Sequence, residues 1–233
     1  MHSCNNLKAT VAAVLVFAAS FFSVPEVNAG ESIASPTSFS VPLADKTSGV
    51  TRTQIGSAFL VEYRESVFLL TNAHVILNAG ITHQFAFKYN DEWVSIGARW
   101  TFTSVDVVAV DVTALVDKAK AGTFRVDSTD LVLGKSQLTA VCNPDESPQL
   151  FTGTYSGVEA DRKIELRFIE KGILPYCSGA PVVDGEFRIR AIVTSGSAES
   201  VTDRIKWGYA IPADVITRFL DEKFFSRSVC CNK

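Results

Sequence analysis

The sequence predicts an all-β protein built from two six-stranded antiparallel β-barrels and a C-terminal α-helix. From about residue 56, short apolar stretches alternate with Gly, Asn, Asp and Ser, which is the pattern of strands joined by turns. These stretches form two runs of roughly six, separated by the polar segment 118–130. Because no helical segment intervenes before the last one, the strands are expected to pair as antiparallel sheets in barrels or a sandwich, and the two runs suggest two barrels.

The strands follow one another along each half of the chain. In the first half, SAFLVEYRESVFLLT predicts two strands around a turn at Arg64–Ser66, and three more segments of strand length follow: HQFAFKYN, WVSIGARWTFT and VVAVDVT. The segments of the second half are SQLTAVC, QLFTGTYSGVE, RKIELRFIE, PVVDGEFRIRAIVTS with a hairpin turn at Asp184–Gly185, and IKWGYAI. After Pro212, apolar residues at i, i+3 and i+4 spacing predict the helix.

The N-terminal stretch predicts a signal peptide. Lys8 precedes the apolar run ATVAAVLVFAASFFSV, and Val27 and Ala29 are the small residues of a cleavage site. The run is short for a transmembrane helix and is followed by proline and glutamate, which disfavours a membrane anchor. We expect cleavage after Ala29 and a secreted or periplasmic protein with no membrane anchor.

These segments define the domain boundaries, with a Ser-, Thr- and Pro-rich arm before the first barrel. We expect a signal peptide over 1–29, an extended N-terminal arm over 30–53, the first β-barrel over 54–120, the second β-barrel over 121–212, the C-terminal helix over 213–225 and a tail over 226–233.

Composition limits the partners and cofactors. The net charge is −3, with acidic and basic residues interspersed and no basic tract, so we expect no nucleic-acid partner. No CxxC pair or Cys/His cluster has the spacing of zinc ligands, and we expect no metal and no other cofactor. An exported chain would keep Cys142, Cys177, Cys230 and Cys231, for which the sequence allows three pairings. The sequence predicts no oligomeric state.

Candidate catalytic residues are few, because only His74 and His83 follow the signal peptide. His74 comes directly after a predicted strand in LLTNAHVI, whereas His83 begins a polar strand. A general base must contact both a nucleophile and an orienting carboxylate, and Asp106 stands at the start of DVVAVDV. Each residue also has a structural interpretation, as a histidine hydrogen-bonded within the fold or an aspartate that caps a strand.

Five regions together resemble the trypsin-like serine peptidases of the chymotrypsin fold, and are most similar to the HtrA-like bacterial branch: GSAFLV with VFLLTNAHVI, DVVAVDV, YCSGAPVV, AIVTSG and WGYAIP. They follow the family's order and separations over about residues 54–222. The resemblance implies a cleft between the barrels in which His74 is the general base, Asp106 fixes its tautomer and Ser178 is the nucleophile.

The implied function is an exported serine endopeptidase that cleaves polypeptides through an acyl-enzyme intermediate. No sequence remains after the helix for a PDZ domain, so we expect a stand-alone peptidase module. Tyr176 departs from the family, which has glycine at this position; its backbone N–H would form the oxyanion hole with that of Ser178. A second glycine of the family is replaced by Ala180. Because glycine adopts peptide orientations that a Cβ resists, a catalytically weak or inactive binding module with the peptidase fold is the alternative function.

The resemblance also implies the substrate contacts. Ile173 would lie at the floor of the specificity pocket, Thr194, Ser195 and Gly196 would pair with the substrate backbone, and Gly208 would open the opposite wall. Since no acidic residue occupies the floor positions, we expect small or medium apolar substrate side chains rather than Arg or Lys.

Cys177, the residue before Ser178, has three interpretations: a disulfide partner, a free buried cysteine or a nucleophile. In the family this side chain turns inward, and TAVCNP resembles the segment beside the nucleophile, which implies a disulfide between Cys142 and Cys177. Two free buried cysteines are the alternative. In a cysteine peptidase of this fold the cysteine replaces the serine itself, whereas here Ser178 is present, which disfavours Cys177 as the nucleophile.

Overall fold

A computed structural model describes residues 40–46, 53–97, 99–117, 125–143, 148–159, 163–168, 176–197 and 207–226. The predicted signal peptide, residues 30–39 of the arm and the tail from residue 227 lie outside the described residues. Within the described part of the chain, no helix is both long enough and apolar enough to span a membrane.

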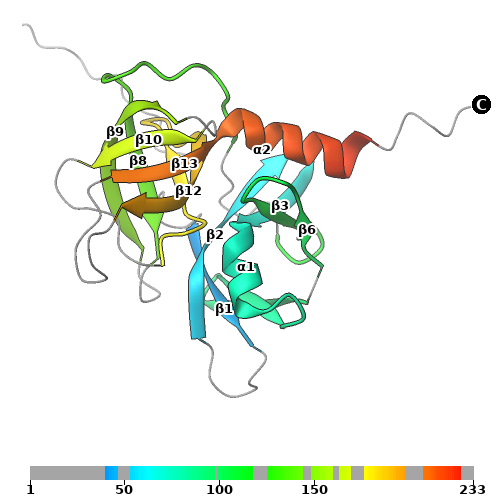
Figure 1. The fold of residues 1–233 in the computed structure, drawn as a ribbon. Coiled ribbons are helices and arrows are strands. Elements are labelled where there is room, and N and C mark those ends of the chain that lie inside the picture. Colours follow the sequence, from blue (N-terminus) through cyan, green and yellow to red (C-terminus); the bar gives the residue numbers. More distant parts are fainter. Residues whose placement is uncertain are drawn as a thin grey trace, which may run out of the picture. The chain divides into compact units, whose positions relative to one another are not determined.

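The first half of the chain forms one curled antiparallel sheet (Figure 1). Its seven strands lie in the order β5-β4-β1-β2-β3-β7-β6. Their bounds are β1 (Ser40–Asp45), β2 (Thr53–Tyr63), β3 (Ser66–Thr71), β4 (Phe85–Tyr89), β5 (Glu92–Gly97), β6 (Thr101–Phe102) and β7 (Val108–Asp111), with helix α1 (Ala73–Ala79) between β3 and β4.

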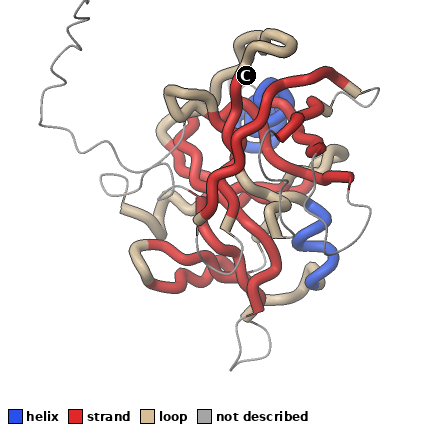
Figure 2. The backbone as a smooth tube through the Cα atoms, turned by 90° about the vertical axis from the view of Figure 1, so that its left-hand side faces the viewer, coloured by secondary structure: helices blue, strands red, loops and turns tan. Residues whose placement is uncertain are grey.

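The second half forms a closed barrel in the order β10-β13-β12-β11-β8-β9. Its strands are β8 (Gln137–Cys142), β9 (Gln149–Val158), β10 (Ile164–Phe168), β11 (Pro181–Val183), β12 (Ile189–Ser197) and β13 (Trp207–Pro212), followed by helix α2 (Ala213–Leu220) and the π-helical turn η3 (Asp221–Phe225). Strands make up most of the backbone and helices little of it, as Figure 2 shows.

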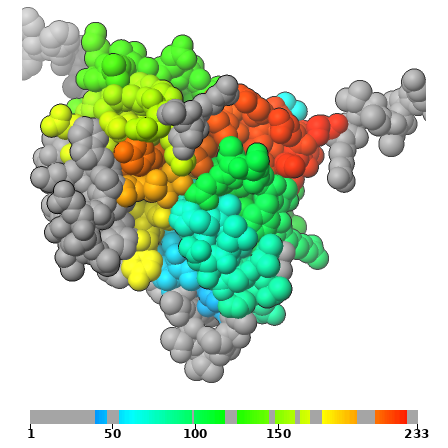
Figure 3. Space-filling model, in the orientation of Figure 1, coloured from blue at the N-terminus to red at the C-terminus, as the bar shows by residue number. Residues whose placement is uncertain are grey.

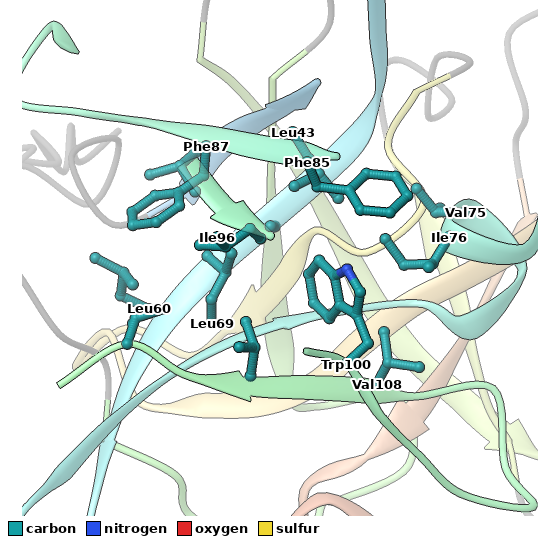
Figure 4. Close-up of a cluster of buried hydrophobic side chains, with 14 of the residues drawn as sticks. Leu43, Leu60, Leu69, Val75, Ile76, Phe85, Phe87, Ile96, Trp100 and Val108 are labelled. Carbon is teal, nitrogen blue, oxygen red and sulfur yellow. The ribbon is translucent and has the colours of Figure 1, made fainter. Parts of the chain in front are cut away.

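Both faces of β2 and β3 are buried, which explains their uninterrupted apolar sequences. Side chains of a strand alternate between the two faces of a sheet. One face contributes Leu60 and Leu69 to the core of the first sheet, together with Phe85, Phe87 and Trp100 (Figure 4). The opposite face packs in a second cluster with side chains of the second barrel and of α2. That cluster is formed by Phe59, Val61, Phe68, Leu70, Val107, Ala109, Val141, Val183, Ile189, Ile192, Ile211, Ile216, Phe219 and Leu220.

The C-terminal helix joins the two halves. In α2, Ile216 and Phe219 are buried in the second cluster, and the helix packs against β12 and β13. In η3, the centroid of the Phe224 ring lies 4.7 Å from the centroid of the Phe68 ring on β3. Asp221 accepts a hydrogen bond from the Tyr63 hydroxyl at 2.9 Å. The helix therefore packs on both halves.

The predicted fold class is confirmed: two antiparallel β units are followed by a C-terminal helix. The second unit is the predicted six-stranded barrel, and the first is a sheet of seven strands rather than six. The sequence segments of this half predict five strands, and WVSIGARWTFT, predicted as one strand, forms two, β5 and β6. The other strand absent from the prediction is β1, which lies within the segment expected to be an extended arm. It pairs with both β2 and β4, and five of its six residues are buried.

We expect Phe68→Ala to lower the free energy of unfolding by about 3–5 kcal/mol, because it removes a buried aromatic ring that contacts η3. Urea denaturation at neutral pH measures the change. The control is Leu77→Ala, whose side chain is 55% exposed and whose loss should change stability by about 0.5 kcal/mol or less. Similar losses in the two variants would contradict this packing.

Candidate active site

His74 and Asp106 meet at one end of the first sheet. β3 ends at Thr71, and His74 is the second residue of the helix that follows. Asp106 lies two residues before β7, which pairs with β3 through Thr71 and Val108. Asp106 Oδ1 accepts the His74 backbone N–H at 2.9 Å, and Oδ2 lies 2.7 Å from His74 Nδ1. An ionised carboxylate has no proton to donate, so Nδ1 carries the proton and Nε2 keeps the lone pair of a base.

Thr194 reaches the same carboxylate from the second barrel. Its hydroxyl donates a hydrogen bond to Asp106 Oδ2. The pairing of β12 with β13 shifts between Val193 and Ser195, so Thr194 is the extra residue of a β-bulge. Bulges redirect individual side chains and are common beside active sites. Thr194 is buried, and its side chain holds the carboxylate. The sequence predicted only a contact with substrate for this residue.

The pKa of Asp106 reflects opposing effects. Burial of the carboxyl raises its pKa, but hydrogen bonds from the His74 ring, the Thr194 hydroxyl and the His74 backbone lower it. The hydrogen bonds prevail, and the pKa lies below the usual value of an aspartate. The Asn72 side chain also donates to the backbone carbonyl of Asp106 at 2.9 Å, which fixes the loop before β7.

The loop that carries Ser178 is hydrogen-bonded to the first sheet. The Ser57 backbone N–H on β2 donates to the Ser178 carbonyl at 3.0 Å, and the Ser57 hydroxyl donates to the Tyr176 carbonyl at 2.9 Å. The Gly179 N–H donates to the Val193 carbonyl on β12 at 3.0 Å. The loop is thus held between β2 and β12, one strand from each half.

Ser178 lies beside the start of α1. A Cβ atom placed on Gly56 would be 3.0 Å from the Val75 side chain and 3.1 Å from the Ser178 carbonyl oxygen, so these two residues approach the same point of β2. Val75 follows His74 in the helix. Among the described residues, the Ser178 side chain forms no hydrogen bond with His74, and the backbone N–H groups of Tyr176 and Ser178 have no acceptor.

Gly179 has no space for a side chain. An added Cβ would lie 2.2 Å from the Ser57 carbonyl oxygen and 2.2 Å from Thr71 Oγ1, and the residue has φ +85°. The Thr71 hydroxyl donates to that same Ser57 carbonyl at 2.8 Å. The residue after Ser178 must therefore be glycine, because the loop touches the backbone of β2.

Tyr176 adopts the backbone conformation that favours glycine, with φ +72°. This left-handed region costs a residue with a Cβ about 1–3 kcal/mol. The Tyr176 side chain is 52% exposed, so its size is not an obstacle. Although residue 176 is tyrosine, its backbone therefore has the conformation that glycine favours.

The predicted disulfide between Cys142 and Cys177 is confirmed. The two Cα atoms are 4.9 Å apart, and both residues are buried. The bond ties the loop before Ser178 to β8. Because the Cys177 sulfur is bonded, it has no thiolate that could act as a nucleophile.

The expected substrate-binding residues are distributed over β12 and β13. Gly196 pairs directly with Gly208 across these strands, and Ser195 is exposed beside them. Ile173 lies outside the described residues. The remaining member is Thr194, whose side chain contacts Asp106.

The second histidine belongs to a different site. His83 Nδ1 lies 2.6 Å from Asp45 Oδ2, so the fold contains two His–Asp pairs. In the described ranges, no group of three or more His, Cys, Asp or Glu residues could hold a metal ion.

Comparison of the sequence with family models and with curated proteins finds no match. Similar solved structures include the HtrA-type protease AlgW with a decapeptide, at 19% identity and TM-score 0.58, covering 74% of this chain and 52% of that chain. A variant of AlgW with a tripeptide has 18% identity and TM-score 0.61, covering 80% and 60%. The serine endoprotease from Yersinia pestis has 15% identity and TM-score 0.59, covering 80% and 62%.

These structures show that the chain has the fold of the HtrA-type serine proteases. The chain spans less than two thirds of the length of each of them. On the surface drawn in Figure 3, the cyan residues of the first sheet lie beside the yellow and orange residues of the second barrel.

Sequence reasoning missed two side chains at this site, Ser57 and the hydroxyl of Thr194 with its contact to Asp106. Ser57 stands in GSAFLV, a segment that the family resemblance singled out without a role for its serine. The family resemblance placed the backbone of Thr194 at the substrate edge, and nothing in the sequence signals the bulge that turns its side chain toward Asp106.

We expect Gly179→Ala to lower the free energy of unfolding by about 2–5 kcal/mol, because the methyl group meets β2 and the left-handed φ disfavours a Cβ. Urea denaturation measures the loss. The control is Gly185→Ala, where a Cβ meets nothing within 4 Å, and where the change should be about 0.5 kcal/mol or less. A tolerated alanine at position 179 would contradict the close approach.

We expect the stability contributed by Asp106 to disappear in acid. Its folded pKa lies below the unfolded value of about 3.9, so the unfolded chain binds more protons and stability falls as pH falls through the folded pKa. The difference in unfolding free energy between the wild type and Asp106→Asn should be full above about pH 4 and shrink below it. Asp91→Asn, whose side chain is 99% exposed, is the control and should show no such trend.

Proposed function

We propose that this chain is an exported serine endopeptidase with His74, Asp106 and Ser178 as its catalytic residues. One observation carries the proposal. The His74–Asp106 pair lies at one end of the first sheet, and β2 of the same sheet holds the Ser178 loop by hydrogen bonds. The fold of the HtrA-type serine proteases supports the assignment.

The reaction begins with attack by Ser178 Oγ on the carbonyl carbon of the scissile peptide bond. His74 Nε2 takes the proton of the hydroxyl as the new C–O bond forms. Asp106 keeps the Nδ1 proton in place and stabilises the imidazolium, since its depressed pKa keeps it ionised at neutral pH. This step requires the Ser178 hydroxyl to hydrogen-bond to His74 Nε2.

The backbone N–H groups of Tyr176 and Ser178 form the oxyanion hole. They donate to the negative oxygen of the tetrahedral intermediate, and neither has another acceptor among the described residues. The left-handed backbone of Tyr176 supports this role for a residue that is not glycine. Removing one such donor typically lowers the rate by about 10²- to 10³-fold.

The intermediate collapses when His74 gives its proton to the leaving amine. The product is an acyl-enzyme ester on Ser178, and a water molecule, deprotonated by the same imidazole, hydrolyses it. Proton transfer therefore uses one base twice, and the chain needs no metal or cofactor for these steps.

The substrate is an extended polypeptide whose backbone pairs with the edge of β12 at Ser195 and Gly196. We propose small or medium apolar side chains before the cleaved bond, with Ile173 and Gly208 in the pocket. Export is supported by the predicted signal peptide and by the buried disulfide, because disulfides persist in oxidising compartments.

We expect His74→Ala to reduce hydrolysis of an unfolded protein substrate by at least about 10³-fold, because no other group takes the Ser178 proton. The control is His83→Ala, which removes the other histidine with an aspartate partner and should retain activity. Ser178→Ala should abolish labelling by a fluorophosphonate, measured by mass spectrometry of the intact protein.

The alternative is a binding module with the same fold. A wild-type protein that neither reacts with the fluorophosphonate nor cleaves any unfolded substrate, while it binds peptides, would favour that function. Activity that survives His74→Ala would exclude the proposed mechanism.

A further inference from the structure

Ser57 uses every polar group that it has. Its backbone N–H donates to the Ser178 carbonyl at 3.0 Å, and its carbonyl accepts the Thr71 hydroxyl at 2.8 Å. Its hydroxyl donates to the Tyr176 carbonyl at 2.9 Å and accepts the Asn143 backbone N–H at 3.1 Å. The residue is fully buried, so no solvent replaces these bonds.

The hydroxyl is the only contact in this set that depends on the side chain of Ser57. The bonds from the backbone N–H and to the carbonyl could be made by any residue of β2 at this position, alanine included. The hydroxyl therefore adds two hydrogen bonds that need the serine side chain. They join β2 to the carbonyl of Tyr176 and to Asn143, the residue after the end of β8.

The first of these bonds acts on the peptide group that follows Tyr176. In the peptide group between Tyr176 and Cys177, the C=O and the N–H point in opposite directions, so a Tyr176 carbonyl held against β2 sets the rotation of this plane. This plane lies between the N–H groups of Tyr176 and Ser178 along the chain. Since Ser57 also holds the carbonyl of Ser178, the loop is fixed at two points two residues apart. The N–H of Ser178 lies between these two points.

The conformation that is held is one that tyrosine disfavours. Tyr176 has φ +72°, and side chains with a Cβ resist this region unless the surroundings impose it. The disulfide at Cys177 restrains the next residue, but it bonds a side chain and leaves the Tyr176 carbonyl free to rotate. The hydroxyl of Ser57 is the group that bonds this carbonyl.

We propose that Ser57 is a positioning residue for the oxyanion hole. Its hydroxyl holds the Tyr176 backbone in the left-handed conformation that presents the donors of the hole. The inference rests on the proposed function. A side chain of the first sheet thus restrains the Ser178 loop, which belongs to the second half of the chain.

The first test is kinetic. Ser57→Ala should lower kcat by about 10- to 100-fold and leave KM within about threefold, because a displaced donor is lost from the transition state more than from the bound substrate. The matched control is Ser40→Ala on the adjacent strand β1. Ser40 is also buried and accepts a hydrogen bond from the same Asn143, through its side chain, but does not touch the loop.

Rates are divided by the concentration of folded protein, determined from the unfolding curve of each variant. Equal kcat values for Ser57→Ala and Ser40→Ala would overturn the proposal. Should Ser57→Ala fail to fold, Ser57→Cys fills the same space with a thiol that is only a weak donor, and a fall in kcat is again expected.

The second test asks whether the hydroxyl acts through the Tyr176 backbone. Glycine adopts the left-handed region without strain, so Ser57→Ala should reduce kcat by a smaller factor in the Tyr176→Gly background than in the wild type. A merely structural role would give the same factor in both backgrounds, and that result would contradict the proposal.

A crystal structure of Ser57→Ala separates this inference from the proposed function. Tyr176 should leave the left-handed region in the variant, whether or not the protein hydrolyses peptides. An inactive wild type with a displaced Tyr176 in Ser57→Ala would reject the proposed function and support the positioning of the loop. An unchanged Tyr176 backbone would reject the positioning in either case.

Discussion

The contact between Gly179 and β2 is the constraint on which the rest of the site depends. The loop that carries Ser178 belongs to the second half of the chain, yet its backbone touches the Ser57 carbonyl and the Thr71 hydroxyl so closely that no Cβ fits. Thr71 is two residues before the start of α1 and three before His74. The approach of two backbones thus decides how near the serine lies to the histidine.

The groups around this contact join the two halves of the chain. Asp106 accepts hydrogen bonds from His74 of its own sheet and from Thr194 of the second barrel, and both lower the pKa of the carboxyl, while the bond from Thr194 also joins the two halves. The loop is restrained by the disulfide on one side and by Ser57 on the other. Asp106 and the Ser178 loop are therefore each hydrogen-bonded to the opposite half of the chain.

Several features of this arrangement could be predicted from the sequence, and the reasons for the misses are physical. The turn predicted at Arg64–Ser66 follows from alternating apolar residues around polar ones, and the structure limits it to Arg64 and Glu65, both with positive φ. The strand β1 was missed because SVPLAD contains Pro42, which disfavours a central strand. The structure accommodates it because β1 pairs with β4 from Leu43 onward, so that at Pro42 it pairs with β2 alone.

The sequence by itself determined the all-β class, the order of the segments and the residue types of the site, because strand alternation and the few histidines are local properties of the chain. The pairing of cysteines needed a resemblance as well, since spacing alone left three possibilities. Only the tertiary structure decided that Thr194 turns toward Asp106, that Ser57 reaches the Tyr176 carbonyl and that Tyr176 takes a glycine-like conformation. These depend on a bulge and on the distance between two β units, which arise when segments remote in the chain pack together.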